Sequence, residues 1–337
     1  GLDALPVIVE VDSVQGMPIF SVVGMADKSI QESKDRVRSA IQSCSYKFPL
    51  ARKIINLAPA ELHKHGTHFD LPIAVGLLLA SNQLEVDMKD IMLIGELGLK
   101  GQIFAVSGVL PALLMARKRG LKKVLIPAGN LNEAALVDEI EIIGVDSLKG
   151  VLDYLKSGEK PDFCVVENFS TEDFVFDFKH IKGQNAVKRA LTVAASGGHH
   201  ILMCGPPGTG KSLLARSFNS ILPALSKDEL LELHKIYSVR SGKSRERVLT
   251  RPFRQVGQNA SAFVLTGGGN DLAPGEVTMA HHGVLFLDEF AELSQRSIDS
   301  LRIPLEEKEI VLRKGGVAVN YPCEFQLVAA MNPCPCG

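Results

Sequence analysis

Hydrophobic positions along the chain recur with two different periods, and these periods predict a protein of mixed α and β structure. Apolar residues that alternate with polar ones are typical of half-buried strands, whereas apolar residues three or four positions apart are typical of one face of a helix. Ile30, Val37 and Ile41 follow the helical spacing. The patterns predict strands over residues 7–11, 19–23 and 123–127, and helices over residues 29–44, 70–80 and 109–120.

The pattern is lost over residues 156–182, where Gly, Pro, Asn and scattered acidic residues replace it. Beyond this segment strand and helix patterns alternate again, as in a second α/β unit. A chain of 337 residues is long enough for two domains of ordinary size. We therefore predict an amino-terminal domain over residues 1–155, a linker over residues 156–182 and a second domain over residues 183–337.

Composition narrows the class of protein. With 46% hydrophobic and 22% charged residues, the chain has enough apolar material to fold, which excludes a disordered protein. Its longest apolar stretch, residues 71–80, is about half of what a membrane-spanning helix needs, so we expect no membrane partner. The start lacks the basic segment of a signal peptide and the six cysteines suit a reducing compartment, so we expect a cytoplasmic protein.

The clearest candidate chemistry lies at the start of the second domain. The apolar run 201–204 precedes the sequence GPPGTGKS and a helical pattern follows it, which is the strand–loop–helix setting of a P-loop. Such a loop cradles phosphates with its backbone N–H groups, while the lysine reaches the β- and γ-phosphates and the serine ligates Mg²⁺. The predicted nucleotide-binding residues here are Gly205, Pro206, Pro207, Gly208, Thr209, Gly210, Lys211, Ser212 and Leu213.

Two later apolar runs end in polar residues that suit the same chemistry. Residues 283–287 lead to Asp288 and Glu289, and residues 326–331 lead to Asn332. Because the carboxyl ends of parallel strands meet at one edge of a sheet, we expect these side chains beside the P-loop. Asp288 would hold Mg²⁺ together with Ser212, and Glu289 would polarise the attacking water. Asn332 would orient that water or contact the γ-phosphate, although alone it is equally typical of a turn.

Together, the stretches GPPGTGKS, VLFLDE, GEVTMAHHG, LRIPLEEKEI and VAAMNPCPCG resemble the AAA+ module of the magnesium-chelatase-like competence proteins, the ComM/YifB family. The resemblance implies a P-loop α/β/α domain with a parallel sheet, ATP and Mg²⁺ as cofactors, and a homo-oligomeric ring, a hexamer in the longer protein. It implies that Lys211, Asp288, Glu289 and Asn332 carry catalysis. It also implies that Ile181 and Gln184 border the adenine, although their tetrapeptide IKGQ alone is more typical of a plain helix start.

The amino-terminal part resembles the Lon-type α+β domain that precedes the ATPase in this family. The resemblance rests on KHGTHFDLP at residues 64–72 and on residues 101–108. Lon proteases use a serine activated by a lysine, and these two positions fall on His68 and Ala112 here. Since a nucleophile needs a base within hydrogen-bond reach, we predict a non-proteolytic domain.

Two regions compete as a DNA contact. Because the formal net charge is only −1, nucleic-acid binding must come from a local basic patch. The predicted hairpin around Arg313 and Lys314 is one candidate; the resemblance implies that such a hairpin points into the ring pore, whereas a plain surface turn is the alternative. The other candidate is a basic stretch that a subunit contact would explain equally well, and it holds Lys235, Arg240, Lys243, Arg245, Arg247, Arg251 and Arg254 against Glu246 alone. Either region would bind single-stranded or branched DNA without sequence specificity.

The resemblance also predicts what lies outside these residues. It implies that the arginine finger and the lid domain follow Gly337, so that the chain as given binds ATP but hydrolyses it poorly. Cys334 and Cys336 cannot complete a four-ligand Zn²⁺ site, and the resemblance implies a further cysteine pair downstream, so a Zn²⁺ site would require a longer protein.

Three functions remain open from the sequence. The first, which we favour, is an ATP-dependent DNA motor with helicase-like branch migration that supports integration of incoming DNA in natural transformation. The second is a chelatase- or chaperone-like ATPase that remodels a protein partner. The third is a nucleotide-binding regulator without motor activity. The Lon-type domain favours the first over the second, because the chelatase subunit is not expected to carry it.

Overall fold

The computed structural model describes residues 2–14, 16–163, 175–239, 250–269 and 272–334. The chain divides into two compact units, which we call the amino-terminal unit, residues 3–167, and the carboxy-terminal unit, residues 168–337 joined by residues 1–2. The boundary falls inside the segment predicted as a linker. Each unit combines helices with strands, as predicted, and parallel strand pairs occur in both.

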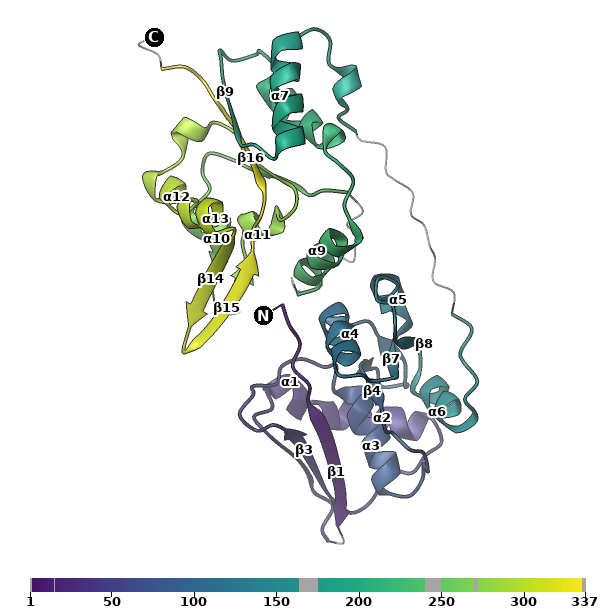
Figure 1. Ribbon diagram of the computed structural model, residues 1–337. Coiled ribbons are helices and arrows are strands. Elements are labelled where there is room, and N and C mark those ends of the chain that lie inside the picture. The colour runs from purple at the N-terminus through teal and green to yellow at the C-terminus, as the bar shows by residue number, and fades with distance from the viewer. Residues whose placement is uncertain (1, 15, 164–174, 240–249, 270–271, 335–337) are drawn as a thin grey trace. The chain divides into compact units, whose positions relative to one another are not determined.

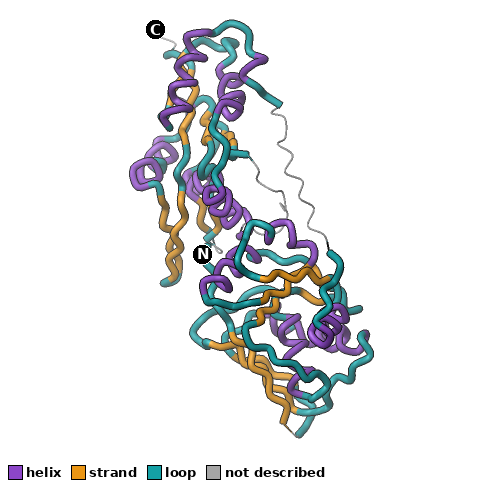
Figure 2. The backbone as a smooth tube through the Cα atoms, turned by 45° about the vertical axis from the view of Figure 1, so that its right-hand side comes forward, coloured by secondary structure: helices purple, strands orange, loops and turns teal. Residues whose placement is uncertain are grey.

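The amino-terminal unit contains two three-stranded sheets and a short hairpin. In the first sheet β3 lies between an antiparallel β1 and a parallel β2, and in the second β7 lies between β4 and β8, all parallel. Figure 2 shows these strands among the helices of the unit. Its elements are β1 (Ile8–Val14), β2 (Phe20–Val23), α1 (Lys28–Gln31), α2 (Ser33–Ser43), β3 (Arg52–Ala58), α3 (Asp70–Ala80), β4 (Ile91–Leu93), β5 (Glu96–Leu97), β6 (Ile103–Phe104), α4 (Val109–Lys118), β7 (Lys123–Pro127), α5 (Leu131–Ala134), β8 (Glu141–Val145) and α6 (Leu148–Ser157).

The apolar faces of these elements bury one core. Helix α3 is apolar nearly all round, and seven of its residues are buried, which makes it the central helix of the unit. Its one charged residue, Asp70, accepts two hydrogen bonds from Arg36 of α2, from Nε at 2.6 Å and from Nη2 at 3.1 Å. Burying a carboxylate is costly unless it is paired, so this ion pair fixes α2 against α3.

The predicted helix over residues 29–44 is wrong in one respect. It forms as two helices, α1 and α2, with Glu32 as a turn residue between them; the side chain of Asp27 caps the start of the first by accepting from the Ile30 N–H. Periodicity does not register this break, since Ile30 and Val37 are buried on both sides of it.

The carboxy-terminal unit is built around a four-stranded parallel sheet with the order β10-β13-β16-β9. The apolar runs predicted as strands are confirmed as β9, β13 and β16. Its elements, most of them labelled in Figure 1, are α7 (Asn185–Gly197), β9 (Ile201–Cys204), α8 (Lys211–Ser217), α9 (Lys227–Val239), β10 (Phe253–Val256), α10 (Ala262–Thr266), β11 (Gly267–Gly268), β12 (Ala273–Pro274), α11 (Glu276–Met279), β13 (Val284–Leu287), α12 (Gln295–Asp299), α13 (Arg302–Glu307), β14 (Glu309–Lys314), β15 (Val317–Pro322) and β16 (Gln326–Met331), with short 3₁₀ turns at Phe178–His180, Phe218–Ile221 and Phe290–Glu292.

The burial of the central strand β13 explains why the strands of this sheet appear in the sequence as continuous apolar runs. All four of its residues are buried. Val284 and Phe286 belong to one hydrophobic cluster, while Leu285 and Leu287 belong to another, because successive side chains of a strand point to opposite faces. The sheet therefore has apolar layers on both faces, as in the predicted α/β/α domain.

Strands β14 and β15 form the predicted hairpin. They pair antiparallel from Glu309↔Pro322 to Lys314↔Val317, so Arg313 and Lys314 belong to the first strand. The two-residue turn is Gly315–Gly316, with φ of 53° and 81°, the left-handed values that a type I′ turn requires. In Figures 1 and 2 the two strands run side by side away from the parallel sheet of their unit.

No helix among the residues that the structure describes is long and apolar enough to cross a membrane.

Candidate nucleotide-binding site

The P-loop connects the end of β9 to the start of α8. Gly208 and Gly210 have φ of 79° and 85°, a left-handed backbone that glycine adopts at no steric cost. A Cβ at either position would meet no atom within 4 Å, so the backbone conformation and not a lack of space favours glycine there. This conformation turns the chain from the strand directly into the helix that begins at Lys211.

Lys211 joins the P-loop to the end of β16. Its Nζ donates to the carbonyl oxygens of Gly205 at 2.7 Å and Pro206 at 2.9 Å, and to Oδ1 of Asn332 at 3.1 Å. Strands β9 and β16 are neighbours in the sheet, which brings Asn332 to the lysine across the whole intervening sequence. The predicted meeting of these two residues is therefore present.

Ser212 and Asp288 form a second connection, from α8 to the end of β13. The Ser212 hydroxyl donates to Oδ2 of Asp288 at 3.0 Å, and the other carboxylate oxygen of Asp288 accepts from the Glu289 N–H at 3.2 Å. Glu289 has φ of 52°, a strained value for a side-chain-bearing residue. A hydroxyl beside a carboxylate is the oxygen donor set that Mg²⁺ takes in nucleotide sites, so these residues fit that ion.

A cleft of about 370 Å³ contains these groups. Its lining comes from three separate segments: the P-loop with the start of α8, the two residues that follow β13, and the end of β16 with Asn332. The residues that line it are Pro207, Gly208, Gly210, Lys211, Ser212, Leu213, Asp288, Glu289, Ala330, Met331 and Asn332.

Ile181 and Gln184, predicted to border the adenine, lie differently from each other. Gln184 lies beside the P-loop, because its Nε2 donates to the Thr209 carbonyl at 3.5 Å. Ile181 is 8% exposed and packs in the apolar cluster that contains Leu191 and Phe218. The structure thus gives Ile181 a core position and does not include it among the residues that line the cleft.

The residues predicted to contact DNA also differ in whether the structure describes them. Arg313 and Lys314 are exposed next to the hairpin turn. Lys243, Arg245 and Arg247 lie outside the described residues.

The last two arginines of the basic stretch are held inside the unit. Arg251 pairs with Glu229 at 2.9 Å and donates to the carbonyl of His282 at 2.7 Å. Arg254 makes a bidentate pair with Glu276, at 2.6 and 2.9 Å. Their inclusion in an open basic patch is therefore wrong, because charge counting along the chain does not register the partner carboxylates.

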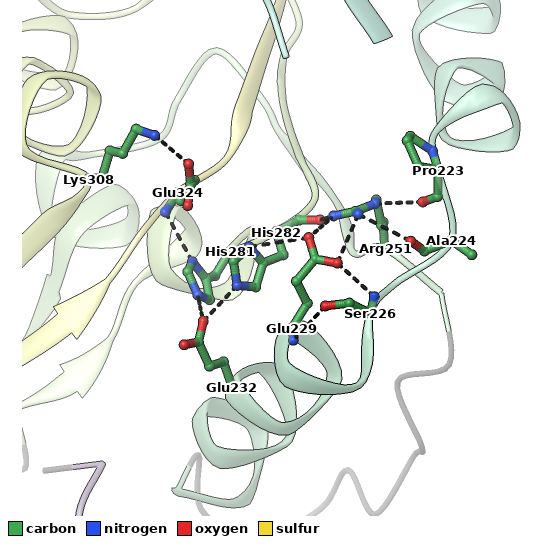
Figure 3. A network of polar contacts seen from close by, with 10 residues as sticks. All are labelled: Pro223, Ala224, Ser226, Glu229, Glu232, Arg251, His281, His282, Lys308 and Glu324. Carbon is green, nitrogen blue, oxygen red and sulfur yellow. Dashed lines mark hydrogen bonds and ion pairs between the residues drawn. The ribbon is translucent and has the colours of Figure 1, made fainter. Parts of the chain in front are cut away.

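Sequence reasoning missed a polar network that joins α9 to the segments before β13 and β16 (Figure 3). Glu232 of α9 accepts from Nε2 of His281 at 3.1 Å and from Nε2 of His282 at 2.7 Å. His281 is 3% exposed on its side chain, and burial lowers its pKa to about 4, so the ring is neutral at pH 7. Burial by itself would raise the pKa of the Glu232 carboxyl. The hydrogen bonds from His282 and His281 lower it by more, so the pKa lies below its usual value.

These three side chains are close enough together to suggest a metal site, yet the protons are wrongly placed for one. The Glu324 N–H donates to Nδ1 of His281 at 3.0 Å, so Nδ1 is the bare nitrogen. The proton of the neutral ring is then on Nε2, the atom that faces Glu232. A metal ligand needs its bare nitrogen facing the ion, and the network is better understood as a hydrogen-bonded clamp.

Comparison with known proteins supplies the relationships of the chain. A family model described as "Magnesium chelatase, subunit ChlI" matches residues 177–337, and one described as "Subunit ChlI of Mg-chelatase" matches residues 9–130. The chain is 41% identical over 345 residues to the competence protein ComM of Haemophilus influenzae, covering all of this chain and 67% of that protein. It is 40% identical over 339 residues to the uncharacterized protein YifB of Escherichia coli, again covering all of this chain and 67% of the relative. The magnesium-chelatase 38 kDa subunit of Cereibacter sphaeroides is 27% identical over 176 residues, which is 47% of this chain and 53% of the subunit.

Proposed function

This chain belongs to the magnesium-chelatase-like ComM/YifB family, and from that premise we propose that it is an ATP-dependent DNA motor. Its activity would be helicase-like branch migration that supports the integration of incoming DNA during natural transformation. The observation that carries the ATPase part is the double connection of the P-loop, from Lys211 to Asn332 and from Ser212 to Asp288.

The roles of the residues follow from their chemistry. Lys211 would exchange its carbonyl acceptors for the β- and γ-phosphates, since a phosphate oxygen forms a stronger, charge-assisted hydrogen bond. Ser212 and Asp288 would hold Mg²⁺, which supplies charge neutralisation between the phosphates when bound. Glu289, next to the metal carboxylate, would orient and polarise the attacking water, and Asn332 would contact the γ-phosphate or that water.

The motor part rests on the β14–β15 hairpin. It presents Arg313 and Lys314 beside its turn, and these side chains can neutralise DNA phosphates without taking part in the nucleotide cleft. A homo-oligomeric ring, a hexamer in the longer protein, would gather several such hairpins around one strand. The name of the Haemophilus influenzae relative, a competence protein, supports this pathway, and a cytoplasmic location is part of the proposal.

The second candidate is remodelling of a protein partner, as the similarity to magnesium-chelatase subunits suggests. The amino-terminal unit gives weaker grounds for choosing between the two functions than its Lon-type resemblance suggested. The family model that matches residues 9–130 also carries the chelatase description. Coverage favours the DNA motor: the ComM and YifB relatives match all of the chain and the chelatase subunit matches 47% of it.

The deciding measurement is ATP turnover with and without DNA. We expect single-stranded or branched DNA to stimulate turnover of the longer protein that contains this chain, and the variant Glu289→Gln to lose turnover in both conditions. The matched control is the hairpin variant Arg313→Ala/Lys314→Ala, which should keep basal turnover and lose the stimulation. Turnover that DNA leaves unchanged would move protein remodelling ahead.

A further inference from the structure

A buried lysine lies near the start of β3, the middle strand of the first sheet of the amino-terminal unit. Lys53 of β3 is 2% exposed, and its Nζ donates to the Ala51 carbonyl at 3.1 Å. The same Nζ lies 4.4 Å from the centre of the Phe48 ring. Arg38 of α2 also faces this ring, with its Cζ at 5.7 Å from the centre. Lys34 precedes Arg38 by four residues on α2, so the two side chains share one exposed helix face.

Neither the buried Lys53 nor the exposed Lys34 and Arg38 has a carboxylate partner among the described residues. Among the residues that the structure describes, no ion pair joins a carboxylate to Lys34, Arg38 or Lys53. Arg36 of the same helix differs, since Asp70 binds it with both oxygens. Burial lowers the pKa of Lys53, and the charges of Arg38 and Lys34 lower it further. The local field is therefore positive and without an internal counter-charge.

We propose that Lys34, Arg38 and Lys53 form a site for the phosphate groups of a nucleic-acid backbone. This inference rests on the proposed function, and it gives the amino-terminal unit a part in it. Lys34 and Arg38 would contact phosphate oxygens directly. Lys53, whose buried Nζ lies against the Phe48 ring, would strengthen the attraction, because a buried charge is screened less by salt than an exposed one.

The geometry favours a polyanion over a small anion. The exposed cations lie on an open helix face, where solvent screens each single ion pair and leaves it worth little. A nucleic-acid strand gains from several such contacts at once and from the release of its counterions. Aromatic and apolar side chains among the basic ones, here Phe48 and the 83% exposed Leu50, are also typical of surfaces that bind nucleic acids.

The test is equilibrium binding of a fluorescent oligo-dT strand to this chain over a range of salt concentrations. We expect Lys34→Gln/Arg38→Gln to weaken binding about tenfold near 0.1 M salt, and to reduce the salt slope by about 1.4 for two lost phosphate contacts. Lys53→Met, which keeps the shape of the side chain, should also weaken binding. Lys89→Gln/Lys100→Gln removes two exposed charges from the same unit and should leave affinity unchanged. Thermal unfolding of each variant shows that the unit is still folded.

The remaining outcomes decide against the inference. If the Lys34/Arg38 variant binds like the wild type while Arg313→Ala/Lys314→Ala weakens binding, this site is wrong and the proposed function stands. If the wild-type chain binds no DNA at all, both fail. Displacement of the oligonucleotide by polyglutamate at equal charge would indicate an acidic protein surface as the partner. Full displacement by millimolar inorganic phosphate would indicate a small-anion site.

Discussion

The ammonium group of Lys211 donates hydrogen bonds to three acceptors, and two of these are backbone carbonyls of its own loop. Hydrogen bonds to neutral carbonyls are weaker than those to an anion, so a nucleotide phosphate can take their place. Asn332 would then remain within reach of Lys211 and of the bound phosphate. At the scale of the residue, the site is therefore assembled, and its lysine has exchangeable partners.

The first prediction separates binding from turnover. Lys211→Ala should lower ATP affinity by at least about 100-fold, because it removes charge-assisted hydrogen bonds to the phosphates. Glu289→Gln should leave ATP affinity nearly unchanged and lower turnover by about 100-fold or more, since only the water-activating carboxylate is lost. Titration with a fluorescent ATP analogue checks the first effect and phosphate release checks the second. Equal affinity of the wild type and Lys211→Ala would refute the assignment of the P-loop.

The second prediction concerns the neutral ring of His281. Its pKa is about 4 in the fold and about 6.5 in an unfolded chain, so below pH 6.5 the unfolded chain binds a proton that the fold does not. The free energy of unfolding should therefore decrease as the pH is lowered from 6.5 to 4, and at pH 5 the loss should be on the order of 2 kcal/mol. The lowered pKa of Glu232 acts in the same direction at more acidic pH.

Urea unfolding at pH 7 and pH 5 measures this dependence. His281→Asn should flatten it, because the amide oxygen can still accept from the Glu324 N–H but does not titrate. The exposed His199 provides the matched control, and His199→Asn should leave the pH dependence as it is. An unchanged pH dependence in His281→Asn would contradict the role given to this ring.

At the scale of the element, the β14–β15 hairpin combines an anchored base with an exposed end. Ile310 and Tyr321, which pair across the strands, are buried, and the Tyr321 hydroxyl donates to the Leu272 carbonyl at 3.0 Å. Arg313 and Lys314 lie beyond this anchor, next to the glycine turn. Substitutions at the end of the hairpin should therefore leave its packing intact.

The third prediction follows from this separation. Arg313→Ala/Lys314→Ala should weaken single-stranded DNA binding and reduce its salt slope by up to about 1.4, if each side chain neutralises one phosphate. ATP affinity should hardly change, because neither residue lines the nucleotide cleft. DNA titrations at several salt concentrations, with and without ATP, measure both. If DNA binding is unaffected, the hairpin is better explained as a contact between subunits.

At the scale of the whole molecule, each unit has its own core, and the two carry different chemistry. The candidate nucleotide cleft draws all of its lining from the carboxy-terminal unit. In the amino-terminal unit, His68 is largely buried against Phe69, with ring centres 4.2 Å apart, and burial lowers its pKa. Ala112 lies in α4 and has no titratable group.

The fourth prediction is that the whole chain does not cleave proteins. Lon proteases use a serine as the nucleophile and a lysine as its base. The resemblance aligns these two positions with His68 and Ala112, so the amino-terminal unit would lack both groups. Casein should remain intact with and without ATP. Cleavage that persists through repurification and disappears when a residue of this unit is replaced would overturn the prediction.

The sequence by itself determined the parts of the site that depend on local order. Strands β9, β13 and β16 are short apolar runs that end in the P-loop, in Asp288 and Glu289, and in Asn332. Parallel strands with buried faces leave this signature, and their shared carboxyl edge places the three ends together. The hairpin was likewise predictable, because two adjacent glycines between alternating runs favour one kind of turn.

Only the tertiary structure decided which charges are free and which are paired. Arg251 and Arg254 appear in the sequence as part of a basic stretch, yet Glu229 and Glu276 neutralise them from other elements. Conversely, Arg38 and Lys53 are ordinary residues of a helix and a strand until packing brings both against the Phe48 ring. Charge is counted along the chain, but electrostatic energy depends on distance and burial, and both are set by contacts between residues far apart in sequence.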